Sequence, residues 1–597
     1  MFYDERTPDR KPEKTTDRKP VKFPQTLQAQ ESQRWFIYAK KANFDRLGYE
    51  NNISNIAARI MINRDIPEED FAKFLGGSFM DLHDAHEMMD MDLAVDIIED
   101  ALKHHKRIRV VGDYDVDGVC ATFILVKALE RLGADVDWVI PDRVKDGYGI
   151  NLRIIDRALE EEIDLIVTCD NGIAALEAIN DAVEHGLQVV ITDHHEAPAV
   201  LPEADAIVDP KQPGDRYPFK DICGAAVAFK MVQFLYEHAG VPAEEWRAFA
   251  DFAAIATVCD VMPLLDENRI IVKNGIEAIK RTGNIGLNEL IDACGIKRES
   301  ISCYTLGFVI GPCINAGGRL ETAGIAMELF LTRDRRDAHD MAAHLKALND
   351  ERKYLTESQG NIARKIVEDE SAEKGCIDDV LVVYLPECHE SIAGIIAGRL
   401  KEHFHHPAIV LTPSESEPDM VKGSARSIEQ YNIYEKLTSV SNLLVKFGGH
   451  KLAAGMTLRY DDIGDFRSRL NSESGLNAED FEEKVWIDVA LPFEMAAERL
   501  MDDLERLAPF GTAFEKPVFA QKDVEILSAK LVPGYRNVVK LRLRDRYGFA
   551  ADGVMFGDGD EILKALAQRA TIDVLYYPKP DVFRGVKKVQ VQIKAWK

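Results

Sequence analysis

The sequence lacks the long apolar runs that cross membranes. None of its hydrophobic stretches reaches the roughly 18 residues that a membrane-spanning helix requires. It also lacks the basic start, short apolar core and small-residue cleavage site of a secretory signal. These absences argue against a membrane protein and predict a cytoplasmic one.

Cysteine is scarce and has no regular pattern. Nine cysteines are scattered through 597 residues, and no two form a C-x-x-C pair. Structural zinc sites and disulfide frameworks need regularly spaced cysteines. The sequence therefore predicts reduced thiols, as in a cytoplasmic protein.

Positive charge is in short supply. The chain has 74 Lys and Arg against 101 Asp and Glu, a formal net charge of −27. This balance disfavours a polyanionic partner, because phosphates are bound by Lys and Arg. It does not exclude one, since a basic groove can coexist with an acidic surface.

The length predicts about three to five domains, at roughly 100 to 200 residues each. Residues 1–30 are rich in Pro, Lys, Arg, Asp and Thr, which is typical of a flexible arm. Seven basic against five acidic residues give only weak support for a nucleic-acid tail. From residue 35 to 105, apolar residues recur at helical spacing.

The most informative stretch is Asp113-Tyr-Asp115-Val-Asp117-Gly, which follows a short apolar strand over 108–111 and precedes an expected helix over 119–132. Alternate residues of an extended segment share a face, so the three carboxylates can converge at the end of the strand. Open α/β sheets place their sites at such ends. Crowded carboxylates repel one another unless a divalent cation compensates their charge.

This stretch has two other interpretations. An EF-hand loop also begins D-x-D-x-D-G, but its twelfth position is Ile124 instead of Glu, and the stretch follows a strand. We reject the EF-hand. A solvated acidic turn remains equally compatible with the motif alone, because short motifs often occur by chance.

Strands and helices alternate after the acidic run. We expect strands over 135–140, 164–169, 188–192 and 206–208, separated by helices such as 152–162 and 174–185. This alternation predicts a mostly parallel, doubly wound sheet.

The ends of these segments carry further acids and imidazoles. Asp170 follows one strand, Asp193-His194-His195 follows the next, and Asp260 ends a later apolar segment. Two consecutive histidines after an aspartate are hard to accommodate in a core. Mixed carboxylate and imidazole ligands suit Mn²⁺ or Mg²⁺.

The second half is expected to contain a long polar helix over 334–368 and then more alternation, with strands 380–384 and 408–411 around a helix over 391–403. A glycine pair precedes His450 and lets the backbone approach a phosphate closely. A tight turn with a surface histidine is the other interpretation.

Strands dominate from about residue 470. Over 538–544 apolar residues alternate with Lys540, Arg542 and Arg544, which places the three basic side chains on one face. The basic face is compatible with nucleic-acid binding, and equally with a solvated strand.

Together the motifs resemble a known family. The stretches beginning at Asp113, Asp170 and Asp193, with Cys259-Asp260, resemble the four ordered motifs of the DHH phosphoesterase superfamily. Four more stretches narrow the resemblance to its RecJ-type single-strand-specific exonucleases, from about residue 55 onward. They are Pro141-Asp-Arg143, Asn315-Ala-Gly-Gly-Arg319, Lys422-Gly-Ser424-Ala-Arg426 and Gly448-Gly-His450.

The resemblance implies a role for each matching residue. The implied metal ligands are Asp115, Asp117, Asp170, His194 and Asp260, with Asp113, Asp193 and His195 as further catalytic residues. The implied substrate-binding residues are Arg143, Arg319, Arg399, Ser424, Arg426, Gly448, Gly449 and His450. The implied nucleic-acid contacts in a C-terminal barrel are Lys540, Arg542 and Arg544.

The resemblance also implies an α/β architecture. We expect a flexible arm (1–30), a helical N-terminal subdomain (31–105), a parallel-sheet DHH catalytic domain (106–275), a helical connector with one long helix (276–370), an α/β DHH-associated substrate-binding domain (371–465) and a C-terminal OB-type β-barrel (466–597).

The activity implied is hydrolysis of single-stranded DNA from the 5′ end with two divalent ions, Mn²⁺ or Mg²⁺, and release of 5′-mononucleotides in DNA repair and recombination. Implied partners are single-strand-binding protein and a RecQ-type helicase, and we expect a monomer. Two rivals are a phosphodiesterase for short oligonucleotides or cyclic dinucleotides, which needs no C-terminal barrel, and an inactive replication scaffold, which predicts lost acids.

Overall fold

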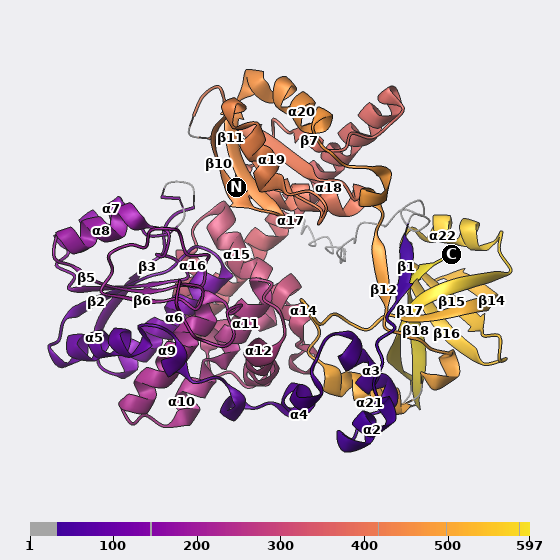
Figure 1. Ribbon diagram of the computed structural model, residues 1–597, viewed down its shortest axis with the longest axis horizontal. Coiled ribbons are helices and arrows are strands. Elements are labelled where there is room, and N and C mark those ends of the chain that lie inside the picture. The colour runs from indigo at the N-terminus through magenta and orange to yellow at the C-terminus, as the bar shows by residue number, and fades with distance from the viewer. Residues whose placement is uncertain (1–32, 144–145, 148, 416, 497, 584–585) are drawn as a thin grey trace, which may run out of the picture. The chain divides into compact units, whose positions relative to one another are not determined.

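The computed structural model describes residues 33–143, 146–147, 149–415, 417–496, 498–583 and 586–597 (Figure 1). The predicted arm over 1–30 lies outside these ranges. No helix of the described ranges is long and apolar enough to cross a membrane. The chain divides into two compact units: Arg34–Ala490 with Ala497–Val518 form the larger, and the smaller includes Leu491–Ala496 and Phe519–Lys597.

The first sheet of the larger unit has five strands in the order β3-β2-β4-β5-β6. All neighbouring pairs are parallel, which confirms the predicted parallel sheet and brings every carboxyl end to one edge. The strands are β2 (Arg107–Val111), β3 (Asp135–Val139), β4 (Leu165–Cys169), β5 (Gln188–Thr192) and β6 (Ala206–Val208).

Helices cover both faces of this sheet (Figure 1). Alternate strand residues divide between two cores: Val110 and Val167 belong to one, and Val111 and Ile166 to the other. Strands buried on both faces are nearly continuous apolar runs, and the sequence here has that composition. The first core includes α5 (Met91–Lys103), α6 (Val116–Arg131) and α9 (Gly224–His238), and the second includes α7 (Leu152–Glu160) and α8 (Leu176–Glu184).

Helix α6 begins three residues earlier than the predicted start at 119. Asp115 accepts hydrogen bonds from the backbone N–H groups of Asp117 and Gly118 and so caps the helix. The acidic run is therefore partly the first turn of a helix, and it is not wholly extended.

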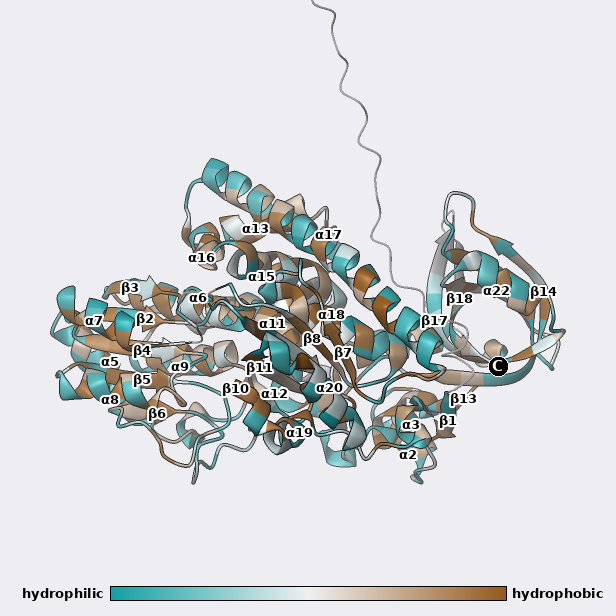
Figure 2. Cartoon of the chain, turned by 90° about the horizontal axis from the view of Figure 1, so that it is seen from above, coloured by the Kyte–Doolittle hydropathy of each residue, from teal (hydrophilic) through white to brown (hydrophobic). Residues whose placement is uncertain are grey.

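The helices that follow pack on the first core. They are α10 (Ala243–Ala248), α11 (Ala250–Cys259), α12 (Asp266–Ile279), α13 (Ile285–Ala293), α14 (Cys303–Thr305), α15 (Gly311–Leu320) and α16 (Gly324–Leu331), with a π-helical segment over Leu306–Ile310. The predicted helix over 334–368 lies within α17 (Arg335–Lys374), whose first turn is capped by Asp334. Much of α17 is hydrophilic (Figure 2).

Short elements near the N terminus pack against a segment from much later in the sequence. Arg269 of α12 is fully buried, and its guanidinium donates to the backbone carbonyls of Phe74, Leu507, Ala508 and Pro509. The elements near the N terminus are β1 (Arg34–Ile37), α2 (Phe44–Glu50), α3 (Asn55–Asn63) and α4 (Phe71–Gly76). The later segment contains β12 (Lys484–Ile487), which pairs in parallel with β1, and α21 (Glu498–Leu507).

The second sheet of the larger unit has the order β10-β11-β9-β8-β7. Only the pair β7 and β8 is parallel, and the other pairs are antiparallel. Its elements are β7 (Leu381–Tyr384), α18 (Glu390–Phe404), β8 (Ala408–Pro413), β9 (Met420–Arg426), α19 (Ile433–Ser439), β10 (Leu444–His450), β11 (Ala453–Arg459) and α20 (Ile463–Ser472).

The smaller unit contains a closed barrel of five strands. The order β14-β15-β16-β18-β17 closes through pairing of β14 with β17, and β16 runs parallel to β18. This confirms the predicted OB-type barrel. The elements are β14 (Phe519–Leu531), β15 (Val538–Arg544), β16 (Ala550–Phe556), α22 (Gly559–Leu566), β17 (Thr571–Phe583) and β18 (Val586–Trp596).

Candidate metal centre and anion pocket

The predicted acids and histidines gather at the carboxyl edge of the first sheet. Asp113, Asp115 and Asp117 follow β2, Asp170 follows β4, and Asp193, His194 and His195 follow β5. Asp260 follows helix α11 instead of a strand. These residues form three overlapping groups, and in each group the possible ligand atoms all lie within 4.8 Å of one another. The groups are Asp170 with Asp193, His194 and His195; Asp117 with His194 and Asp260; and Asp113 with Asp115 and Asp170.

Backbone N–H groups hold the side chain of Asp117 in place. The N–H groups of Gly224 and Ala225, at the start of α9, donate to its two carboxylate oxygens at 2.7 and 2.8 Å. A helix N-terminus carries partial positive charge and stabilises a carboxylate. A Cβ on Gly224 would lie 2.6 Å from Cβ of Asp170, so only glycine lets this helix approach so closely.

His194 lies among three carboxylates. Its Nε2 is 3.0 Å from Oδ1 of Asp170, 3.5 Å from Oδ2 of Asp117 and 3.8 Å from Oδ2 of Asp260. Its ring is almost fully buried, and burial lowers its pKa. A neutral imidazole surrounded by carboxylate oxygens is the form of histidine that binds a divalent metal.

Buried Asp193 and partly exposed His195 form an ion pair beside this cluster. Asp193 accepts from the backbone N–H groups of His194, His195 and Ile173, and its Oδ1 lies 2.7 Å from Nδ1 of His195. Burial opposes charge on both groups, but their mutual hydrogen bond lowers the pKa of Asp193 and raises that of His195 to about 9. The hydrogen bond with Asp193 therefore favours the protonated form of His195.

The remaining carboxylates are destabilised as anions. Burial and the charge of Asp115 raise the pKa of Asp113 to about 8, and burial and Asp117 raise that of Asp260 to about 8. Burial and Asp117 raise the pKa of Asp170 well above its ordinary value. Oδ2 of Asp260 is buried without a hydrogen-bond partner among the described residues. Such a set fits a divalent cation, whose charge would offset the repulsion.

Two residues of this edge escaped the sequence analysis. Asp209 directly follows β6 and is fully buried, and burial with the charge of Asp193 raises its pKa to about 7. Asn171 bridges the strand ends, since its amide donates to the carbonyls of Val111 and Cys169. The position of Asp209 after the strand over 206–208 was a usable signal, because the other acids occupy the same place on their strands.

Several predicted substrate-binding residues converge on an anion pocket. Burial and the charge of Arg143 lower the pKa of Arg319 to about 10, and the same two causes lower that of Arg426. Three guanidinium groups that repel one another at close range form a favourable place for an anion. Gly394 of α18 packs against this group, since a Cβ there would lie 3.2 Å from Nη2 of Arg426 and 3.3 Å from Oγ of Ser424.

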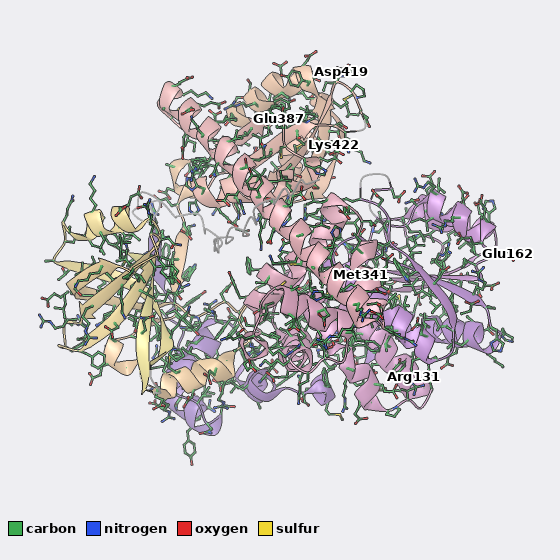
Figure 3. All side chains as sticks on the ribbon, turned by 180° about the vertical axis from the view of Figure 1, so that it is seen from behind. Arg131, Glu162, Met341, Glu387, Asp419 and Lys422 are labelled. Carbon is green, nitrogen blue, oxygen red and sulfur yellow. The ribbon has the colours of Figure 1, made fainter. Side chains whose placement is uncertain are left out.

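A cavity of about 590 Å³ is lined by loops that follow strands of the first sheet and by strands β9, β10 and β11 of the second. Arg143 and Tyr114 line it from the first sheet, and Ser424 and Gly448 from the second. The guanidinium of Arg143 lies 4.8 Å above the ring of Tyr114. Lys422 of β9, which is labelled in Figure 3, also lines it. Its ammonium group pairs with Glu390 at 3.0 Å.

The predicted substrate-binding residues Arg399, Gly449 and His450 do not line this cavity. Arg399 of α18 neighbours Arg352 of α17, whose pKa it lowers together with burial. Gly449 and His450 follow Gly448 on β10 and are exposed.

The basic face of β15 in the smaller unit is partly neutralised. Val539, Leu541 and Leu543 are buried as predicted, and Lys540 is exposed. Arg542 pairs with Asp552 at 2.9 Å and Arg544 with Glu525 at 2.7 Å. Two of the three charges therefore have acidic partners, which favours the solvated-strand interpretation.

Family models match three parts of the chain. Residues 107–257 match the DHH family, N-terminal domain; residues 378–474 match the DHHA1 domain; and residues 487–595 match the RecJ OB domain. The domain boundaries given above remain predictions.

The chain is similar to several characterised proteins. It is 36% identical to the single-stranded-DNA-specific exonuclease RecJ of Bacillus subtilis, over 91% of this chain and 68% of that protein. The crystal structure of RecJ from Thermus thermophilus in complex with Mn²⁺ matches with a TM-score of 0.81 at 27% identity, covering 95% of this chain and 80% of that one. The Mg²⁺ complex of RecJ from the same organism matches with a TM-score of 0.75 at 26% identity, covering 95% and 79%.

Replacing Asp170 should weaken metal binding more than replacing any acid outside the cluster. Asp170 belongs to two of the three ligand groups, so Asp170→Asn removes a charge that both share. We expect Mn²⁺ affinity, measured by isothermal titration, to fall at least about tenfold, a free-energy difference of about 1.4 kcal/mol. Asp156→Asn, on the exposed face of α7, is the control and should bind as wild type. Equal affinity of the two variants would contradict the assignment.

Proposed function

Because this chain belongs to the RecJ family of DHH phosphoesterases, we propose that it degrades single-stranded DNA from the 5′ end and releases 5′-mononucleotides. One observation carries the proposal: carboxylates suited to divalent cations cluster at the carboxyl edge of the first sheet, and Arg143 and Ser424 line a cavity that is also bordered by Tyr114 of the acidic loop. A phosphodiester requires both, because its reacting phosphate is activated by metals and its neighbouring phosphate needs cationic recognition.

The proposed metal ligands are four carboxylates and one imidazole of the cluster. Two divalent ions, Mn²⁺ or Mg²⁺, would be held by Asp115, Asp117, Asp170, His194 and Asp260. When bound, such ions lower the pKa of a water and stabilise the charge on the phosphate and the leaving oxygen. Asp170 is the best candidate for a ligand shared by both ions, since it belongs to two of the ligand groups.

The chain's own polar groups orient this centre. Asp193 fixes the ring of His195 through a hydrogen bond with Nδ1, and this bond favours the protonated form of the ring. The backbone amides at the start of α9 fix Asp117, and the N–H of Gly149 lies 3.4 Å from Oδ1 of Asp113. Each catalytic side chain thus has a defined direction before substrate binds.

Recognition of the 5′ end is assigned to the anion pocket. Arg143 approaches from the loop after β3, and Ser424 and Arg426 from β9. Guanidinium groups bind phosphate oxygens in pairs, and a hydroxyl adds one more hydrogen bond. A terminal phosphate carries more charge than an internal one, so this pocket favours the end of a strand. Arg319, whose Nη1 donates to the carbonyl of Ser391 at 2.6 Å, lies between this pocket and the acidic loop.

The two rival functions fit the molecule less well. A phosphodiesterase restricted to short oligonucleotides or cyclic dinucleotides has no need of the closed barrel in the smaller unit. An inactive scaffold would have lost catalytic acids, yet every acid of the predicted set is present and clustered.

The proposed function includes a cellular process, a compartment and partner proteins. We assign the enzyme to DNA repair and recombination in the cytoplasm, acting as a monomer with single-strand-binding protein and a RecQ-type helicase as partners. Lys540, Arg542 and Arg544 are proposed to assist binding of longer strands, although the ion pairs of the two arginines reduce the charge that they offer.

A degradation assay tests the activity directly. With Mn²⁺, we expect single-stranded DNA carrying a 5′ label to lose the label as a mononucleotide from the first turnover, while a blunt duplex of the same sequence stays intact. The physical reason is that the end pocket holds one strand terminus next to the metal cluster. Initial release of a 3′ label, or equal degradation of the duplex, would contradict the proposed polarity or strand specificity.

A second experiment tests how the end is recognised. Arg426→Ala should lower the ratio of kcat/KM for 5′-phosphorylated over 5′-hydroxyl strands by about tenfold or more, since a hydrogen bond to a charged group contributes about 1.5–3 kcal/mol. Arg459→Ala, an exposed arginine of β11 in the same sheet, is the matched control and should keep the wild-type ratio. If Arg426→Ala keeps that ratio as well, this arginine does not recognise the phosphate.

A further inference from the structure

Two cysteines of the helical connector are in contact. Sγ of Cys294, at the end of α13, lies 3.6 Å from Sγ of Cys313 in the first turns of α15. Cys313 is fully buried, whereas Cys294 is only partly buried. The two sulfurs need to approach by about 1.5 Å to reach the bond length of a disulfide, which is about 2.05 Å.

Polar groups around the pair stabilise a thiolate on the buried member. The side-chain amide of Asn349 donates to Sγ of Cys313 at 3.1 Å, and Arg352 fixes that amide by donating to its oxygen at 2.9 Å. The hydrogen bond with Cys294 lowers the pKa of Cys313 and raises that of Cys294. Burial opposes the thiolate of Cys313, whereas Asn349 and the charges of Lys353 and Lys346 favour it. Nearby lysines favour the thiolate form of a cysteine, which is the nucleophile in disulfide exchange.

The helix that carries Cys313 also carries groups of the proposed active site. Arg319 lies six residues further along α15, and Gly318 packs so tightly on the acidic loop that a Cβ there would lie 2.6 Å from the carbonyl oxygen of Tyr114. A displacement of α15 therefore changes the position of Arg319 relative to the acids that flank Tyr114.

We propose that Cys294 and Cys313 form a reversible disulfide and that this modification site lowers nuclease activity when a small-molecule disulfide, such as oxidised glutathione, accumulates. The effect on activity rests on the proposed function, whereas the disulfide itself does not. Intracellular disulfides are usually transient and redox-sensing, and the pair fits that class.

The exchange proceeds in two balanced steps. Sγ of Cys294 attacks one sulfur of the small disulfide while its proton passes to the thiolate of Cys313, and the first small thiolate leaves. That thiolate takes the proton back from Cys313, whose sulfur then attacks Sγ of Cys294 and displaces the second small thiolate. The two protein sulfurs are oxidised to one disulfide, and the small disulfide is reduced to one thiol, which keeps the proton of Cys294, and one thiolate.

The experiment has one readout for the bond and one for the activity. The full-length protein is incubated with oxidised glutathione, and its peptides are analysed by mass spectrometry without reduction. We expect a cross-link between the peptides of Cys294 and Cys313, and a fall in kcat/KM on single-stranded DNA of about tenfold or more, because misplacement of active-site groups by about 1 Å can cost up to about a hundredfold. Dithiothreitol should restore the activity.

Matched variants separate this pair from the other thiols. Cys294→Ser should retain activity under the oxidant, because its position is partly exposed and tolerates a hydroxyl, and Cys313→Ala provides a second insensitive variant. Cys376→Ser removes an exposed cysteine outside the pair and should respond like wild type.

The cross-link and the change in kcat/KM test different parts of the proposal. A glutathione adduct on Cys294 without a cross-link would overturn the proposed disulfide whatever the activity. A quantitative cross-link with unchanged kcat/KM would overturn the control of activity. If the reduced protein does not degrade DNA at all, the proposed function fails while the cross-link can still be detected.

Discussion

The mutual repulsion of buried carboxylates is the constraint on which this structure depends. Parallel strand ends and one helix end bring the acids together in a setting where burial raises the pKa of Asp113, Asp170 and Asp260. Neighbouring backbone N–H groups offset part of the cost for Asp117 and Asp193, which accept hydrogen bonds from them. The remaining charge calls for divalent cations, so the cluster is incomplete without them.

The opposite electrostatic problem occurs among the arginines. Burial and the charge of Arg143 lower the pKa of Arg319 and of Arg426. Placing an excess of negative charge near an excess of positive charge gives a substrate phosphate a fixed direction. The acidic composition of the whole chain is therefore compatible with a polyanionic substrate, because the local field of the cavity differs from that of the surface.

The parts that could be predicted from the sequence follow from local rules. Parallel strands place their carboxyl ends at one edge, so acids after consecutive strands were expected to meet, and they do. Alternation over 538–544 likewise predicted which side chains of β15 are buried. The parts that escaped prediction depend on contacts between residues distant in the sequence. The amides of Gly224 and Ala225 reach Asp117 over more than a hundred residues, and the contact of Cys294 with Cys313 requires two helices to pack in one particular way. Neither contact leaves a periodic signal in the sequence, whereas the position of Asp209 after a predicted strand was visible and was overlooked.

The central claim is that the acidic cluster holds two divalent ions in a site shared through Asp170. Anomalous diffraction at the manganese edge from crystals grown with Mn²⁺ tests it most directly. The account predicts two peaks about 3.5–4 Å apart within the set formed by Asp115, Asp117, Asp170, His194 and Asp260, with Asp170 next to both peaks. A single peak, or two peaks that do not share Asp170, would contradict it.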